Sequence, residues 1–202
     1  MSTRVLRHEQ ATSRNVLSAL DVDELYFSCH GRFDSQDPSR SALFMAHDDV
    51  LNLPQILEMR LPKAPVVILG ACETALTDHT DVLDELEGLH TAFLLAGARV
   101  VVGSLWSVSD FSTSLLLARL HGRIWRRRTR VSEALAFAQR WLRDLTATSA
   151  HRIVNRMERQ GVQQQHVESA HRLIDDLSSQ HGTPFRHPYW WAAFQAVGGP
   201  AS

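Results

Sequence analysis

The stretch that most limits how this chain can fold is Val66 to Leu69, four consecutive apolar residues between Pro65 and Gly70. A short apolar run that is rich in β-branched residues and bounded by turn residues is typical of a strand buried on both faces. Such strands form parallel sheets that helices cover. The chain continues through Ala71 to Cys72. Because open α/β sheets place reactive groups at the carboxyl ends of their strands, we expect a functional site here.

Other segments predict strands and helices around this one. Asp23 to Cys29 is a short strand-like run that ends at His30, and Arg99 to Leu105 predicts a third buried strand. Further strands are expected at 3–7, 41–46 and 187–197, and helices at 13–20, 53–61, 83–96, 110–128, 131–145 and 162–177. Strands that alternate with helices indicate an α/β fold with a mostly parallel sheet and helices on both of its faces.

Size and charge exclude several classes of function. The chain has 202 residues, enough for one α/β domain with a sizeable core. Its 21 Lys and Arg nearly balance its 22 Asp and Glu, so nothing in the net charge requires nucleic acid or an anionic membrane as a partner. No segment approaches the roughly 20 apolar residues of a membrane span. The first 20 residues carry charges throughout, unlike a signal peptide, so we expect a cytoplasmic protein.

Cys72 and His30 are the residues most suited to chemistry. Both follow strand-like runs, and neighbouring parallel strands end at the same edge of a sheet, which would bring a thiol nucleophile and its base together. The backbone N–H groups of Gly31 and Cys72 could bind the oxyanion that forms during attack. The alternative for His30 is a hydrogen-bonded histidine at a strand end. Cys29 is expected to be a small core residue, and a disulfide between the two cysteines is not expected at this size.

Four blocks of the sequence resemble one known family. They are FSCHGRFD, LGACETA, GLHTAFLLAGARVVVGSLWSVSD and HPYWWAAF, at residues 27–34, 69–75, 88–110 and 187–194. In this order they resemble the CHAT domain, a family of caspase-like cysteine peptidases related to separase and the caspases. The resemblance implies a caspase-like three-layer α/β/α sandwich and a single domain over residues 1–202.

The same resemblance implies a catalytic dyad of His30 and Cys72 that needs no third acidic residue. Two departures from the family pattern stand out. Ala75 replaces the usual Gly after the CET triplet, and family members usually carry another strand and helix before the segment that matches Met1 to Arg14. We therefore expect the chain to be a short version of the domain or a piece of a longer protein. Family members often follow helical repeats, so a helical-repeat regulatory domain or protein is an expected partner.

The SLWSVSD block, Ser104 to Asp110, resembles a run in separase whose last Asp lies in the pocket for the basic residue before the cleaved bond. That Asp corresponds to Asp110, and we place Trp106 and Ser104 in the same substrate-binding set. A buried carboxylate would favour Arg or Lys in the substrate. The alternatives are that Asp110 is a helix N-cap and that Trp106 belongs to the core.

Two functions follow from these observations. The first is a cysteine endopeptidase that cleaves a partner protein under a regulatory, signalling-linked control. The second is an inactive caspase-like module for protein–protein contact. No cofactor is expected, because no phosphate-binding glycine loop occurs. No metal is expected either, because the histidines form no ligand spacing with Cys72. The basic run at 126–130 fits a helix end better than a nucleic-acid site.

Overall fold

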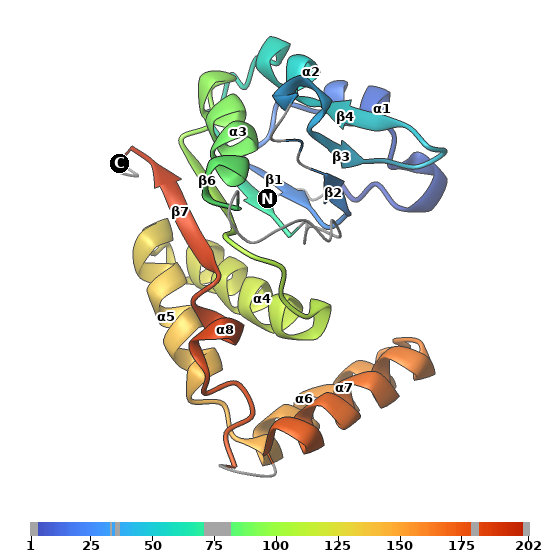
Figure 1. The fold of residues 1–202 in the computed structure, drawn as a ribbon, viewed down its shortest axis with the longest axis vertical. Helices are drawn as coiled ribbons and strands as arrows, with labels where there is room; N and C mark the ends of the chain where they lie inside the picture. The colour runs from blue at the N-terminus through green and yellow to red at the C-terminus, as the bar shows by residue number, and fades with distance from the viewer. Residues whose placement is uncertain (1–3, 33, 35–36, 71–81, 179–181, 200–202) are drawn as a thin grey trace. The chain divides into compact units, whose positions relative to one another are not determined.

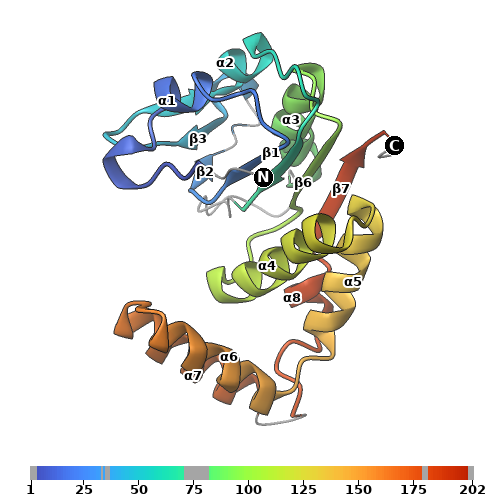
Figure 2. The same ribbon diagram turned by 180° about the vertical axis from the view of Figure 1, so that it is seen from behind.

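The computed structural model describes residues 4–32, 34, 37–70, 82–178 and 182–199 (Figures 1 and 2). The chain divides into two compact units. The first contains residues 1–107 and 194–202, and the second contains residues 108–193. The described part of the first unit combines strands and helices, whereas the regular structure described in the second is helical.

A four-stranded sheet forms the centre of the first unit, in the order β1-β5-β6-β7. These strands are Glu24–Phe27, Val66–Leu69, Val100–Ser104 and Phe194–Gly198. The first three are parallel and β7 is antiparallel to β6. Every residue of β5 and β6 is buried, which explains why β5 and the first three residues of β6 form continuous apolar runs and not alternating ones. The predicted α/β class with a mostly parallel central sheet, as in caspase-like domains, is confirmed.

A second, smaller sheet is antiparallel and has the order β2-β3-β4. Its strands are Gly31–Arg32, Ala42–Phe44 and Val50–Asn52. The strand expected at 41–46 is therefore confirmed as β3. Because β2 begins directly after His30, this sheet fixes the backbone at the candidate base.

Local sequence signals explain the helices of the first unit. Thr12 caps α1 (Ser13–Leu17), and its hydroxyl accepts the N–H of Asn15 at 3.3 Å. Helix α2 (Leu53–Glu58) begins with a capping box, in which Asn52 and Gln55 bond each other's backbone N–H at 3.0 and 2.9 Å. Helix α3 (Val82–Leu95) is followed by Gly97 at φ +109°, a conformation that suits glycine at a helix end. Short 3₁₀ turns lie at 8–10 and 38–40.

The second unit contains α4 (Asp110–Arg127), α5 (Val131–Arg143), α6 (Ala147–Arg159), α7 (Gln164–Ser178) and α8 (Pro188–Trp191). Helices α4 and α5 lie side by side, and α6 and α7 form a hairpin (Figures 1 and 2). Both helices of the hairpin bury a narrow stripe of small or β-branched side chains: Ala150, Val154, Val167, Ala170 and Ile174. Their other faces are mostly polar and exposed.

Three expectations from the sequence were wrong in detail. Residues 4–7 form no strand, and the first regular element described is the 3₁₀ turn at 8–10. The polar segment after residue 146 contains α6 as well as the expected helix, and the last strand is preceded by α8.

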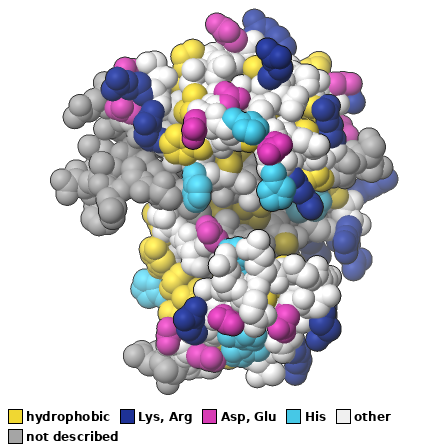
Figure 3. All heavy atoms as spheres, turned by 90° about the vertical axis from the view of Figure 1, so that its right-hand side faces the viewer, with side chains coloured by type: hydrophobic (Ala, Val, Ile, Leu, Met, Phe, Trp, Pro, Cys, Tyr) yellow, Lys and Arg dark blue, Asp and Glu magenta, His cyan; other side chains and the backbone are white. Residues whose placement is uncertain are grey.

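No helix within the described ranges has the length and apolar character needed to cross a bilayer. On the face shown in Figure 3, the hydrophobic side chains form small patches between charged ones.

Candidate active site

Strands β1 and β5 are neighbours in the sheet, and their last residues lie opposite each other. Phe27 is paired with Leu69, and the N–H of Gly70 donates to the carbonyl of Phe27 at 2.8 Å. The chain therefore leaves the sheet at two adjacent points. This is the arrangement of strand ends that the sequence predicted.

His30 is exposed and lies between β1 and β2. Its carbonyl accepts the N–H of Phe44 at 2.8 Å. In an antiparallel ladder, pairs that exchange hydrogen bonds alternate with pairs that do not. Since His30 and Phe44 are bonded, the next pair, Gly31 and Leu43, is of the other kind. The N–H of Gly31 is thus turned away from β3, and β2 is an edge strand of this sheet.

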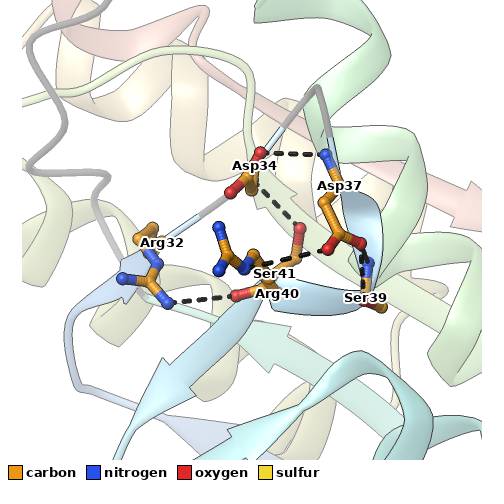
Figure 4. Close-up of polar contacts among 6 residues, drawn as sticks. All are labelled: Arg32, Asp34, Asp37, Ser39, Arg40 and Ser41. Atoms are coloured by element: carbon orange, nitrogen blue, oxygen red, sulfur yellow. Dashed lines mark hydrogen bonds and ion pairs between the residues drawn. The ribbon is translucent and has the colours of Figure 1, made fainter.

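The loop that follows β2 is held by a group of polar contacts (Figure 4). Asp37 accepts the N–H and the hydroxyl of Ser39 at 3.2 and 2.5 Å and pairs with Arg40 at 3.7 Å. Asp34 accepts the N–H of Asp37 at 2.9 Å, while its own N–H donates to the buried hydroxyl of Ser41 at 3.1 Å. These contacts therefore join the start of the loop to Ser41, the residue directly before β3.

Cys72 and Ala75 lie outside the described residues, as does the whole of 71–81. The separation between His30 and Cys72 therefore stays a prediction, as does the effect of alanine in place of glycine at position 75.

Cys29 is a free thiol that packs against the core of the first unit. Loss of solvation on burial raises its pKa from 9.0 to about 11. Because the thiolate is the reactive form, a thiol with this pKa is a poor nucleophile at neutral pH. Cys29 behaves as the core residue that its sequence context suggested.

One buried titratable group was missed by the sequence analysis. His90 on α3 is 2% exposed, and neither ring nitrogen has a hydrogen-bond partner within the described structure. Burial lowers its pKa from 6.5 to about 4, so the ring is neutral at pH 7. It packs against Gly103 in β6, where a Cβ atom would overlap Nε2 of His90. A glycine inside a buried strand was the sequence signal for such a close approach.

The three residues assigned to substrate binding lie in different environments. Ser104 is buried at the end of β6 opposite Phe194, and Trp106 is partly buried. Asp110 is exposed and is the first residue of α4, so its carboxylate lies at the favourable end of the helix dipole. Ser109 is the N-cap and accepts the N–H of Phe111 at 3.3 Å, so the cap alternative for Asp110 is wrong. A pocket that combines the three remains a prediction.

A family model for the CHAT domain matches residues 1–199. The chain belongs to the CHAT domain family. This match includes all four motifs noted in the sequence, and the family is one of caspase-like peptidases. No curated protein matches the chain. Within the residues that the structure describes, no three His, Cys, Asp or Glu side chains are arranged to hold a metal ion in this CHAT domain.

Proposed function

We propose that this CHAT domain is a cysteine endopeptidase in which Cys72 is the nucleophile and His30 the proton carrier. The observation that carries the proposal is the level ending of β1 and β5, joined by the bond between Gly70 and Phe27 at 2.8 Å. The two segments that bear the predicted dyad leave the sheet from these neighbouring ends. The exposure of His30 is also compatible with contact to a substrate.

In the proposed reaction, His30 takes the thiol proton and the sulfur of Cys72 attacks the peptide carbonyl carbon. The N–H groups of Gly31 and Cys72 donate to the oxyanion that develops, and the orientation of the buried Gly31 N–H away from β3 is compatible with this role. His30 then gives its proton to the leaving amine. Water hydrolyses the resulting thioester and restores the thiol.

We further propose that the substrate is a protein cut after Arg or Lys, with Asp110, Trp106 and Ser104 at the pocket for that residue. A guanidinium facing a carboxylate forms a bidentate, charge-assisted hydrogen bond. Regulation by a helical-repeat partner, in a signalling setting, completes the proposal. This regulatory part of the proposal rests on the family membership alone.

The test compares the wild-type protein with Cys72→Ala, His30→Ala and the matched control Cys29→Ala. A pooled peptide library, read by mass spectrometry, should be cut by the wild type and by Cys29→Ala but not by the other two variants. The library also reports the residue before the cleaved bond, and Asp110→Ala should reduce any preference for Arg or Lys.

A second readout needs no substrate, so it holds even if a partner must activate cleavage. Iodoacetamide should alkylate Cys72 faster in the wild type than in His30→Ala, because a neighbouring imidazole favours the thiolate. If Cys72 were alkylated in both proteins at the same rate, and that rate were the one of an unperturbed thiol, an uncut library would refute the dyad. These results would favour the inactive protein-binding module instead.

A further inference from the structure

A hollow of about 640 Å³ lies in the second unit between α5 and α6. One side is formed by Phe137, Arg140 and Trp141 on α5, and the other by Arg152 and Arg156 on α6. A volume of this size is in the range of small-molecule sites in proteins. Neither the predicted dyad nor any of the family motifs includes these residues.

Three arginines in this hollow have no acidic partner among the described residues. The guanidinium groups of Arg140, Arg152 and Arg156 form no ion pair or hydrogen bond with any described residue. Arg152 and Arg156 are four residues apart on one helix, so they project from the same face about 6 Å apart along the axis. Arg140 faces the hollow from the other helix. Planar guanidinium groups in this number suit an anion with several oxygens, such as a phosphate chain.

Asp144, the one carboxylate among the described residues of the lining, is already neutralised. Asp144 accepts two hydrogen bonds from Arg143, at 2.7 and 2.9 Å, and this contact lowers the pKa of the carboxyl. The positive charge of Arg186 acts on Asp144 in the same direction. The hollow therefore keeps a surplus of positive charge.

Aromatic rings provide a second kind of surface. The guanidinium of Arg119 on α4 lies 4.7 Å from the ring centre of Trp141, and that of Arg123 lies 4.4 Å from the ring centre of Phe137. No α4 residue lines the hollow, so these cations cover the rings from another side. The indole of Trp141 remains available to the hollow. A flat π-system next to arginines is a surface on which a nucleobase can stack.

The charge of the whole unit agrees with this local picture. Residues 108–193 contain 13 arginines, no lysine and seven acidic residues, a formal charge of +6. The rest of the chain has eight basic and 15 acidic residues, a formal charge of −7. The near-neutral total thus conceals a cationic helical unit, whose field would raise the local concentration of anions.

We propose that the hollow binds a nucleoside di- or triphosphate, with the phosphates held by Arg140, Arg152 and Arg156 and the base stacked on Trp141. Three guanidinium groups, two from α6 and one from α5, account for a polyphosphate chain, and the indole accounts for the base. This inference does not depend on peptide cleavage.

The experiment is isothermal titration of the full 202-residue chain with ATP, GTP, adenosine and inorganic triphosphate at physiological ionic strength. We expect saturable one-to-one binding of at least one nucleoside triphosphate. The double variant R152Q/R156Q should weaken it by about tenfold or more, since both charge-assisted contacts are lost. Trp141→Leu should weaken the nucleotide but leave the weaker binding of inorganic triphosphate unchanged. Circular dichroism and thermal melting establish that each variant is folded.

The matched control is R126Q/R127Q, which removes the same charge from two exposed arginines at the end of α4, outside the hollow. It should leave the affinity unchanged. Equal weakening in this control would show that only the general charge of the unit attracts the anion, and would overturn the proposal. So would the absence of binding by every nucleotide at millimolar concentration, or inorganic triphosphate binding as tightly as the nucleotides.

Discussion

Acid should destabilise this protein through His90, and the size of the effect can be worked out from its burial. The ring is 2% exposed and both nitrogens lack partners in the described structure, so the native state disfavours the charged imidazolium. The native pKa is about 4, against 6.5 for an exposed histidine. Below pH 6.5 His90 becomes protonated in the unfolded chain, whereas in the folded chain it stays neutral until about pH 4. Stability from the neutral ring is therefore present above pH 6.5 and lost as the pH falls towards 4.

The expected loss follows from the two pKa values. Between about pH 7.5 and about pH 5, linkage predicts a decrease of about 2 kcal/mol in the free energy of unfolding, which reaches about 3 kcal/mol near pH 4. For a domain whose total stability is about 5–15 kcal/mol, this is a large fraction.

The assay is urea unfolding of the wild type and of His90→Leu at the two pH values, followed by circular dichroism. Leucine is apolar and fills a similar volume, so it removes the titration and the two unpartnered nitrogens together. Other groups also titrate in this range, but they do so in both proteins. The difference in stability between wild type and variant therefore isolates His90.

We expect that difference to shift by about 2 kcal/mol in favour of the leucine variant on going from about pH 7.5 to about pH 5. A shift below about 0.5 kcal/mol would refute the reasoning, because it would mean that the ring is solvated or paired in the folded protein.

Three further predictions follow from local structure. Gly103→Ala should lower the free energy of unfolding by about 1–3 kcal/mol, because the added Cβ would overlap His90. In a His90→Ala background the same substitution should cost clearly less, and an equal loss in the two backgrounds would contradict the packing. In the Cys72→Ala variant, Cys29 should react with iodoacetamide far more slowly in the native state than in urea, because burial raises its pKa to about 11. Similar alkylation rates in the two states, measured by mass spectrometry, would count against its burial. Asn52→Ala should lower the free energy of unfolding by about 1 kcal/mol and Asn52→Asp should not, as chemical denaturation can establish.

The parts of the fold that the sequence predicted well are those where burial determines the residue types. Both β5 and β6 are buried on two faces, so β5 and the first three residues of β6 are continuous apolar runs. The prediction located β6 to within one residue at each end. Helix α6 was missed because its buried stripe consists of only Ala150 and Val154, among polar and charged residues. The apolar residues Ala150, Ile153, Val154 and Met157 do recur at helical spacing, but the polar composition of the segment outweighed that signal in the prediction.

The candidate site could be predicted only in part, for a related reason. The position of His30 at the edge of the sheet follows from where a strand ends, and strand ends leave a local signal. The contact between His90 and Gly103 joins two elements that are 13 positions apart, and no local pattern specifies which side chain a helix presents to which strand residue. The same applies to the arginines of α5 and α6, which look like ordinary surface residues until the helices are packed.

The pairing of β7 with β6 has a consequence for how the protein is made. Ser104 pairs with Phe194 and Val100 with Gly198, so the partners are separated by 90 to 98 positions of chain. During synthesis on the ribosome, the edge of β6 that bonds to β7 stays unpaired until the entire helical unit has been made and β7 emerges. An apolar strand with an open edge is a template for wrong pairing during that interval. Truncation shortly before residue 194 should therefore yield a chain that aggregates, even though nearly all of its helices are present.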